Sequence, residues 1–178
     1  MRRKTLDLLL TLVGALITVG LLVASGLLAW GYTFANSQVH NQLEQQRVYF
    51  PTKSQLEGAS YNKLITPYLL PYAGKELLTG REAEVYADHY IAVHLQEIGG
   101  GKTYSQVTAK EGPLSQTAQL LFQGNTLRGE LLTAYAFGTF ALIAEWSVVT
   151  ALVLAVLMFI LTLLGWQHYR RRDPEEVI

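Results

Sequence analysis

The side chains best suited to chemistry lie in the middle of the chain, and the clearest motif among them is Gly99-Gly-Gly-Lys102-Thr103. This run resembles the end of a phosphate-binding loop, in which backbone amides and a lysine hold phosphate groups. Such a loop also requires a glycine five residues before its last glycine, following a β-strand. Position 96 is Gln96, and the residues before the run have helical spacing. We therefore interpret the run as a helix stop followed by a turn capped by Thr103.

Three histidines, His40, His89 and His94, are candidate metal ligands. On one α-helix, His89 and His94 would lie about 140° apart and would not hold one metal ion together. His94 falls on the apolar stripe of a predicted helix, so we expect a hydrogen-bonded core histidine there. His89 falls off that stripe beside Asp88, and His40 precedes Glu44 by four residues. We expect these two side chains to be solvated and predict no metal site.

Other catalytic signatures are weak. No serine lies in a Gly-x-Ser-x-Gly elbow. The chain has no cysteine, which excludes disulfides, thiolate metal sites and cysteine nucleophiles. We therefore predict no catalytic, cofactor-binding or metal-binding residues and no cofactor, and an enzyme is the less favoured class.

Two uncharged stretches, residues 8–30 and 146–166, determine how the remaining residues are positioned. Half of the 178 residues are hydrophobic and 16% are charged, whereas soluble domains average about 25% charged residues. As helices the two stretches would be roughly 34 and 31 Å long, which is enough to cross a hydrocarbon core of about 30 Å. The sequence thus predicts two transmembrane helices.

Flanking charge predicts the orientation of these helices. The basic residues 2–4 precede the first stretch and Arg170, Arg171 and Arg172 follow the second. Positive residues near span ends stay in the cytoplasm, so we expect a multi-pass plasma-membrane protein with both termini cytoplasmic. A cleaved signal peptide is the alternative for the first stretch, although its apolar run is longer than the usual 7–15 residues.

The predicted divisions are a cytoplasmic N-terminus (1–7), transmembrane helix 1 (8–30), an extracytoplasmic helical domain (31–145), transmembrane helix 2 (146–166) and a cytoplasmic C-terminus (167–178).

Small residues recur four apart in both spans, at Gly20 and Ala24 and at Ala151 and Ala155. Such pairs allow two helix backbones to approach closely. Three readings stay open: packing between the spans, packing between protomers, and chance. A further stripe, Ala134, Gly138, Ala141 and Glu145, suits packing against the extension of the first helix.

Helical spacing continues beyond both spans. The first helix is predicted to run to about Phe50, because Pro51 disfavours helix at the residue before it. The second is predicted from Leu131 onward, with Asn125 or Thr126 as its cap. Glu145 adjoins Trp146 and is placed at the membrane interface, although a span shifted by a few residues would put this carboxylate inside the membrane.

The intervening segment reads as short helices. Thr79-Gly-Arg-Glu82 fits a capping box before a helix that is stopped by Gly99. Its predicted inward face is Ala83, Tyr86, Ala87, Tyr90, Ile91, His94, Leu95 and Ile98. Residues 103–110 form another turn or two before Gly112, and 114–123 a helix with Ala118, Leu121 and Phe122 inward. Strand signals are weak, so the predicted fold class is all-α.

Two segments carry a resemblance to a known group of proteins. They read YADHYIAVHLQEIGGGKTYSQV and GNTLRGELLTAYAFGTFAL. The chain resembles a group of small two-span membrane proteins of actinobacteria, with a helical outer segment and a "GGKTY" turn. The resemblance covers the architecture end to end and residue patterns mainly over 80–145. Some members bear the label of aromatic ring-opening dioxygenase, which implies iron held by two histidines and a carboxylate. This chain offers no such triad, so the resemblance implies an actinobacterial envelope and no reaction.

Three functional hypotheses follow. The first is a non-catalytic envelope protein whose outer domain binds a partner membrane protein or a second copy of itself. The second is an enzyme or small-ligand or metal binder that uses the tyrosine-rich region 61–104 with His89 or His94. The third is a transport accessory subunit, motivated by Glu145. A net charge of zero without a basic run outside the termini argues against nucleic acid and leaves the lipid bilayer as a predicted partner.

Overall fold

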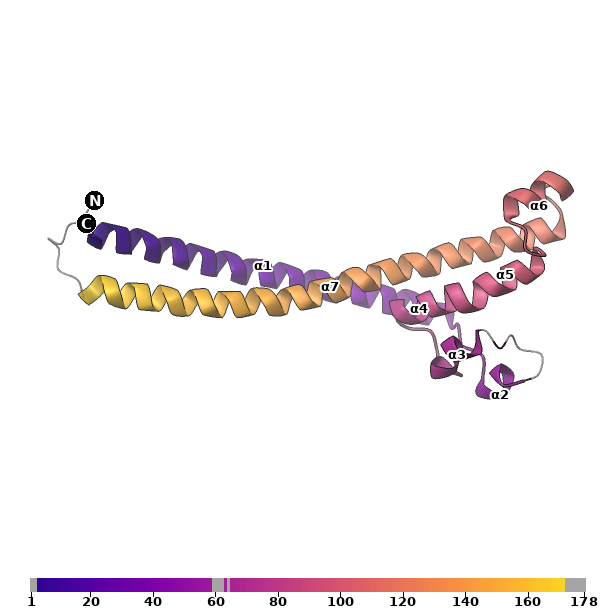
Figure 1. Cartoon of the computed structure of the whole chain (residues 1–178), viewed down its shortest axis with the longest axis horizontal. Coiled ribbons are helices and arrows are strands. Elements are labelled where there is room, and N and C mark those ends of the chain that lie inside the picture. The colour runs from indigo at the N-terminus through magenta and orange to yellow at the C-terminus, as the bar shows by residue number, and fades with distance from the viewer. Residues whose placement is uncertain (1–2, 59–62, 64, 172–178) are drawn as a thin grey trace. The chain divides into compact units, whose positions relative to one another are not determined.

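The computed structural model describes residues 3–58, 63 and 65–171 and is helical throughout, with no strand in these ranges. Two long helices, α1 (Arg3–Gln46) and α7 (Gln116–Arg171), carry most of the chain (Figure 1). The only backbone pairing between extended residues described is an isolated bridge of Tyr49 with Glu76. The shorter helices are α2 (Lys53–Leu56), α3 (Thr66–Leu69), η1 (Leu70–Tyr72), α4 (Gly80–Tyr86), η2 (Ala87–Ile91), α5 (Ala92–Ile98) and α6 (Tyr104–Glu111). The all-α expectation is confirmed.

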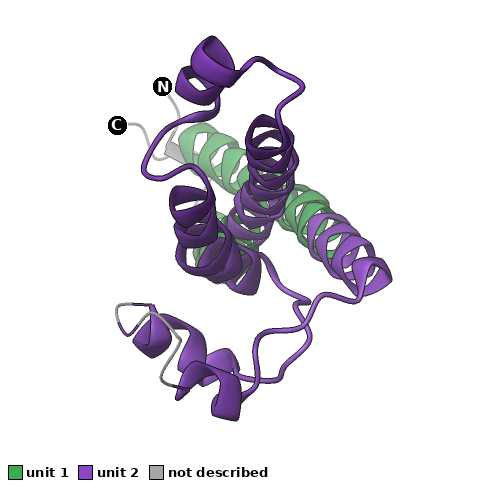
Figure 2. Ribbon diagram, turned by 90° about the vertical axis from the view of Figure 1, so that its right-hand side faces the viewer, with its two compact units in different colours: residues 1–33, 142–178 green, residues 34–141 purple. Residues whose placement is uncertain are grey.

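The chain forms two compact units, coloured separately in Figure 2. Unit 1 contains residues 1–33 and 142–178, and unit 2 contains residues 34–141. Each long helix contributes one part to each unit. The two units are described separately below.

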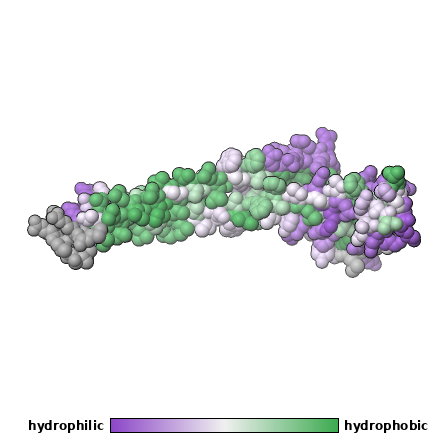
Figure 3. Space-filling view, turned by 90° about the horizontal axis from the view of Figure 1, so that it is seen from above, coloured by the Kyte–Doolittle hydropathy of each residue, from purple (hydrophilic) through white to green (hydrophobic). Residues whose placement is uncertain are grey.

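Unit 1 exposes many large apolar side chains. Both long helices are long and apolar enough to cross a membrane, and hydrophobic side chains cover much of the unit (Figure 3). The side chains of Leu16, Leu27 and Trp146 are 73%, 65% and 67% exposed. Soluble monomers rarely expose a contiguous apolar surface of this extent. Hydrocarbon around these side chains would remove the cost of exposing them to water.

The interior of unit 1 is a seam of small and hydroxyl residues. Thr11, Thr18 and Ser25 recur every seven residues along α1 and are buried. Their hydroxyls donate to carbonyl oxygens one turn earlier, at 2.8 Å in each case. This bonding satisfies the hydroxyl donors within the helix itself, so that they can be buried away from water. A seven-residue repeat keeps one face of a helix toward its neighbour.

Helix α7 contributes the predicted small pair to the interior of unit 1. Ala151 and Ala155 are 8% and 2% exposed, so this pair packs within the chain. The predicted pair on α1 does not: Gly20 and Ala24 are exposed, and a Cβ on Gly20 would meet nothing within 4 Å. The physical reason is helix phase, because Gly20 lies two residues, or about 200°, beyond the buried Thr18.

In unit 2 the first long helix ends at Gln46, short of the predicted Phe50. Arg47 has φ 50°, a left-handed conformation that terminates helices. The following residues are extended and hydrogen-bond to a second segment. The amide of Leu77 donates to the carbonyl of Val48 (2.8 Å), and that of Phe50 donates to Lys75 (2.9 Å). These bonds draw Phe50 into the core, where it is 2% exposed.

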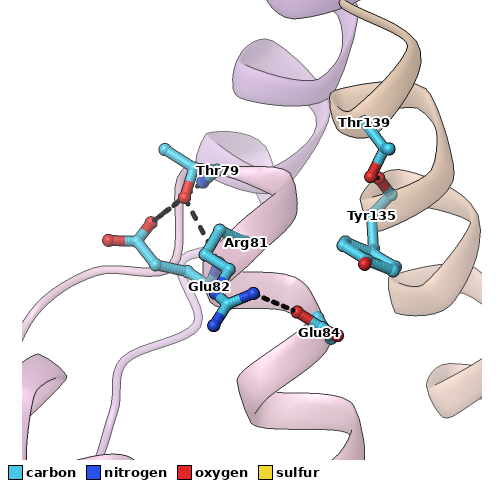
Figure 4. Close-up of polar contacts among 6 residues, drawn as sticks. All are labelled: Thr79, Arg81, Glu82, Glu84, Tyr135 and Thr139. Atoms are coloured by element: carbon cyan, nitrogen blue, oxygen red, sulfur yellow. Dashed lines mark hydrogen bonds and ion pairs between the residues drawn. The ribbon is translucent and has the colours of Figure 1, made fainter. Parts of the chain in front are cut away.

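The predicted capping box before α4 is confirmed (Figure 4). The amide of Glu82 donates to the Thr79 hydroxyl at 3.3 Å, and the Glu82 carboxylate accepts the Thr79 amide at 2.9 Å. The helix then passes through one π-helical stretch, η2, and ends at Gly99 as predicted. Of the predicted inward residues, Ile98 is 43% exposed and therefore does not belong to the core.

The second long helix begins fifteen residues earlier than the predicted Leu131, at Gln116, and the predicted cap at Asn125 or Thr126 is wrong. Both side chains instead donate to carbonyls one turn earlier, Leu121 at 2.8 Å and Phe122 at 2.9 Å. Such bonds leave the helix backbone uninterrupted. The segment 114–123, which was predicted as a separate helix, therefore belongs to the start of this continuous helix.

The core of unit 2 forms where α7 meets the shorter helices. Ala118 and Leu121 are buried as expected, but Phe122 is 58% exposed. Gly138 of the small-residue stripe contacts Gly80, the first residue of α4: a Cβ on Gly138 would lie 3.0 Å from the Gly80 Cα. The core residues are Val39, Leu43, Phe50, Leu56, Ile65, Leu69, Leu77, Ala83, Val85, Ala87, Ile91, Leu95, Val107, Ala118, Leu121 and Leu131.

Candidate functional site

The three histidines singled out in the sequence make separate contacts. The Nδ1 atom of His94 lies 2.7 Å from the carbonyl oxygen of Tyr90, which confirms a hydrogen-bonded histidine in a half-buried position. His89 is also half-buried rather than solvated, because its ring stacks on Tyr68 at a centroid distance of 3.9 Å. His40 lies half-buried on α1. Over the described ranges, no group of three His, Asp or Glu side chains has metal-binding geometry.

Three tyrosines of the second functional hypothesis, Tyr72, Tyr86 and Tyr90, belong to a run of packed rings. Phe50 stacks on Tyr72 at 5.2 Å and meets Tyr86 edge-on at 5.3 Å. Tyr86 adjoins Tyr90 at 4.6 Å, and Tyr90 adjoins His94 at 4.4 Å. Aromatic pairs at these separations stabilise a fold by about 0.5–1.5 kcal/mol each beyond their burial. The contacts give these rings a structural role in unit 2.

The glycine-rich turn also behaves as the sequence predicted. Gly100 and Gly101 have φ values of 57° and 77°, a region that glycine enters without steric cost. Thr103 caps α6: its amide donates to the Gln106 side chain at 2.9 Å, and its hydroxyl accepts the Gln106 amide at 3.4 Å. The segment is thus a helix stop followed by a capped helix, and no strand precedes it as a phosphate-binding loop would require.

An ion pair that no sequence pattern indicated joins the π-helical stretch to α7. The Nη2 atom of Arg128 donates to Oδ1 of Asp88 at 2.7 Å, with both side chains more than a third exposed. π-Helical insertions are frequent at functional sites. Here the insertion lies beside a cationic side chain whose Nε atom is buried without a hydrogen-bond partner among the described residues.

Unit 2 has a groove of about 510 Å³ between α1 and α7. Its floor is apolar: Val39, Leu43 and Leu131 are 6%, 3% and 2% exposed. Two half-exposed rings, Phe34 and Phe137, also line it. Polar side chains complete the lining, namely Gln38, Gln42, Gln46, Glu130 and Thr133. The sequence indicated the amphipathic α1 segment and a packing stripe on α7 that includes Ala134, but not the groove that lies between the two helices.

Unit 1 contains a cavity of about 440 Å³ that the sequence did not indicate. Asp7, Thr11, Thr162 and His168 are the polar residues among its lining. The Nε2 atom of His168 lies 3.9 Å from Oδ2 of Asp7, whose side chain is 16% exposed. The available signal was the position of Asp7 immediately before the apolar stretch. Glu145, the carboxylate that the sequence singled out, is exposed on α7.

Comparisons with known proteins add no assignment: no protein-family model, curated protein or solved structure matches this chain. The geometry of the groove, the cavities and the apolar helices is therefore the basis for assigning a function.

Proposed function

We propose that this chain is a two-pass membrane protein of the cell envelope that binds a helix of another membrane protein in the groove between α1 and α7. In this proposal both termini are cytoplasmic and unit 2 lies outside the membrane. The groove carries the proposal, because it combines a buried apolar floor with exposed aromatic rings. The proposed role is non-catalytic, in an accessory or scaffolding subunit.

The lengths of the two helices support the membrane part of the proposal. Helices α1 and α7 contain 44 and 56 residues, or roughly 66 and 84 Å. Because a hydrocarbon core is about 30 Å thick, each helix would extend well beyond it. Lys4 lies at the start of α1, and Arg170 and Arg171 lie at the end of α7. Positive residues near span ends favour the cytoplasm, so we expect both of these helix ends on the cytoplasmic side.

The chemistry of the groove supports a helical partner. An amphipathic helix can bury an apolar stripe against Val39, Leu43 and Leu131, as helices do in other hydrophobic grooves. The glutamine side chains at the groove can donate and accept hydrogen bonds without bringing a charge into the interface. Interface cores are depleted of charged residues and enriched in aromatic ones, and only one lining residue, Glu130, is charged.

Photocrosslinking tests the groove directly. A photoreactive phenylalanine analogue at Phe137, which is 52% exposed inside the groove, should yield an adduct in native membranes. The same analogue at Phe122, 58% exposed but outside the groove, is the matched control. Mass spectrometry would identify the adduct as another membrane protein. An adduct with a second copy of this chain would replace the proposed partner by a homo-oligomer. Equal labelling at both positions, or none, would refute the groove as the binding surface.

A further inference from the structure

A second cavity in unit 2, of about 310 Å³, has not entered the proposed function. It lies among α5, the Gly99–Thr103 turn and α7. Ala92, Leu95 and Leu121 give it an apolar side, and Lys102, Asn125 and Arg128 give it polar groups. Its lining is polar and apolar in similar parts. Pockets for small ligands combine apolar walls with a few convergent polar groups and have volumes of about 300–1,000 Å³.

The charged residues that line this cavity are both cationic. Lys102 is exposed and makes no ion pair with any described residue. Arg128 engages Asp88 through Nη2, and a guanidinium has five N–H donors, so donors remain for a second acceptor. No carboxylate is among the described residues that line the cavity. In a chain with zero net charge, this local excess of positive charge favours an anion.

Close packing around two glycines, Gly99 and Gly124, preforms the cavity. A Cβ on Gly124 of α7 would lie 2.4 Å from Cδ2 of Leu95, and one on Gly99 would lie 2.5 Å from the carbonyl oxygen of Lys102. Glycine at position 124 therefore makes room for the Leu95 side chain against α7, and glycine at position 99 allows the turn to close tightly on itself. The capping box of Thr103 and Gln106 fixes the turn from its other side. A preformed site avoids part of the ordering cost of binding.

We propose that this cavity binds a small organic anion, in which a carboxylate or phosphate group contacts Lys102 and Arg128 and an apolar body lies against Leu95 and Leu121. This site is separate from the groove of the proposed function, and neither depends on the other. The lysine of the Gly99–Thr103 motif is thus part of a cavity that α7 completes. It does not belong to a loop that wraps a nucleotide.

Fluorine NMR on the full chain in lipid nanodiscs tests the proposal. The probes are 4-(trifluoromethyl)benzoate, 4-(trifluoromethyl)phenylphosphonate and the uncharged 4-(trifluoromethyl)benzamide. At least one of the two acids should bind saturably, and the amide should bind at least about tenfold more weakly, because hydrogen bonds between two charged groups are stronger than those of a neutral acceptor. The tighter acid identifies the anionic group. No saturable binding by either acid, or equal binding of the amide, would overturn the proposal.

Variants then place the binding in the cavity. Lys102→Met should weaken binding of the acid about tenfold, and Lys102→Arg should retain most of the affinity because the cation is kept. Lys102 is exposed, so neither change disturbs the fold. Lys110→Met is the matched control, since Lys110 is an exposed cation of α6 that does not line the cavity. Equal affinities for the Lys102→Met and Lys110→Met variants would place the anion elsewhere and refute the assignment.

Discussion

Gly138 of α7 and Gly80 of α4 meet backbone to backbone: a Cβ on Gly80 would lie 2.9 Å from the carbonyl oxygen of Ala134 and 3.1 Å from the Cα of Gly138. No side chain separates the two helices at this point. The contact places the start of α4, with its capping box, directly on the long helix. Unit 2 therefore requires glycine at both positions. The steric reason is the contact between the two backbones, which the sequence around either position does not show.

Replacement of Gly138 by alanine should destabilise unit 2. The added methyl would lie 3.0 Å from the Gly80 Cα, which requires the two backbones to move apart, and overpacking of this kind costs about 1–3 kcal/mol. Thermal unfolding in detergent, followed by circular dichroism, measures the loss as a lower midpoint.

Gly129→Ala is the matched control for that experiment. Gly129 lies on the same helix, is exposed, and has nothing within 4 Å of an added Cβ. Alanine there should raise the stability of the helix by about 0.5–1 kcal/mol, because glycine loses more backbone entropy. If the two alanine variants shifted the midpoint in the same direction, the Gly80–Gly138 contact would not be the determinant.

The seam of unit 1 offers a test by rescue. A Cβ on Gly14 would lie 2.7 Å from Oγ1 of Thr162, so Gly14→Ala should lower the unfolding midpoint. The double variant Gly14→Ala, Thr162→Ala removes the obstructing hydroxyl and should recover most of the loss. Coupling energies between contacting residues are about 0.5–3 kcal/mol. Gly20→Ala, at a position with open space, should not lower the midpoint, and additive effects of the Gly14 and Thr162 changes would contradict the contact.

Two of the threonines that the sequence suggested as helix caps, Thr79 and Thr126, should respond differently to substitution. Thr79→Ala removes a hydroxyl that accepts the Glu82 amide and should destabilise the fold by about 1 kcal/mol, the usual effect of losing an N-cap. Thr126→Ala removes only an exposed bond to the carbonyl of Phe122 and should have little effect. Denaturant titration of both variants measures the difference. A larger loss at Thr126 would mean that a helix does begin there.

Local signals in the sequence predicted much of this fold. The two apolar stretches, the caps at Thr79 and Thr103 and the stop at Gly99 each depend on residues within one or two helical turns. Such interactions are encoded by neighbouring residues. The two caps and the stop are confirmed, and the two stretches lie in helices long and apolar enough to cross a membrane. The histidine bond of His94 to Tyr90 is also local, since the two residues are one turn apart.

Features that depend on distant residues were missed. Asn125 has the chemistry of a cap, and only its bond back to Leu121 within a continuous helix decides against that role. His89 was expected in solvent because the sequence does not show that Tyr68 will stack on it. The cavity around Lys102 required Arg128 from α7, and no spacing rule joins these two positions. Tertiary packing supplied each of these contacts.

The proposed orientation can be tested because the chain has no native cysteine. A single cysteine at Lys110, exposed in unit 2, should react in intact cells with a maleimide that cannot cross membranes. A single cysteine at Glu176, in the C-terminal tail, should react only after the cells are permeabilised. Neither substitution removes one of the basic residues next to the spans that are expected to hold the tails in the cytoplasm. Labelling of position 176 but not position 110 in intact cells would reverse the sidedness, and the groove of unit 2 would then face cytoplasmic partners.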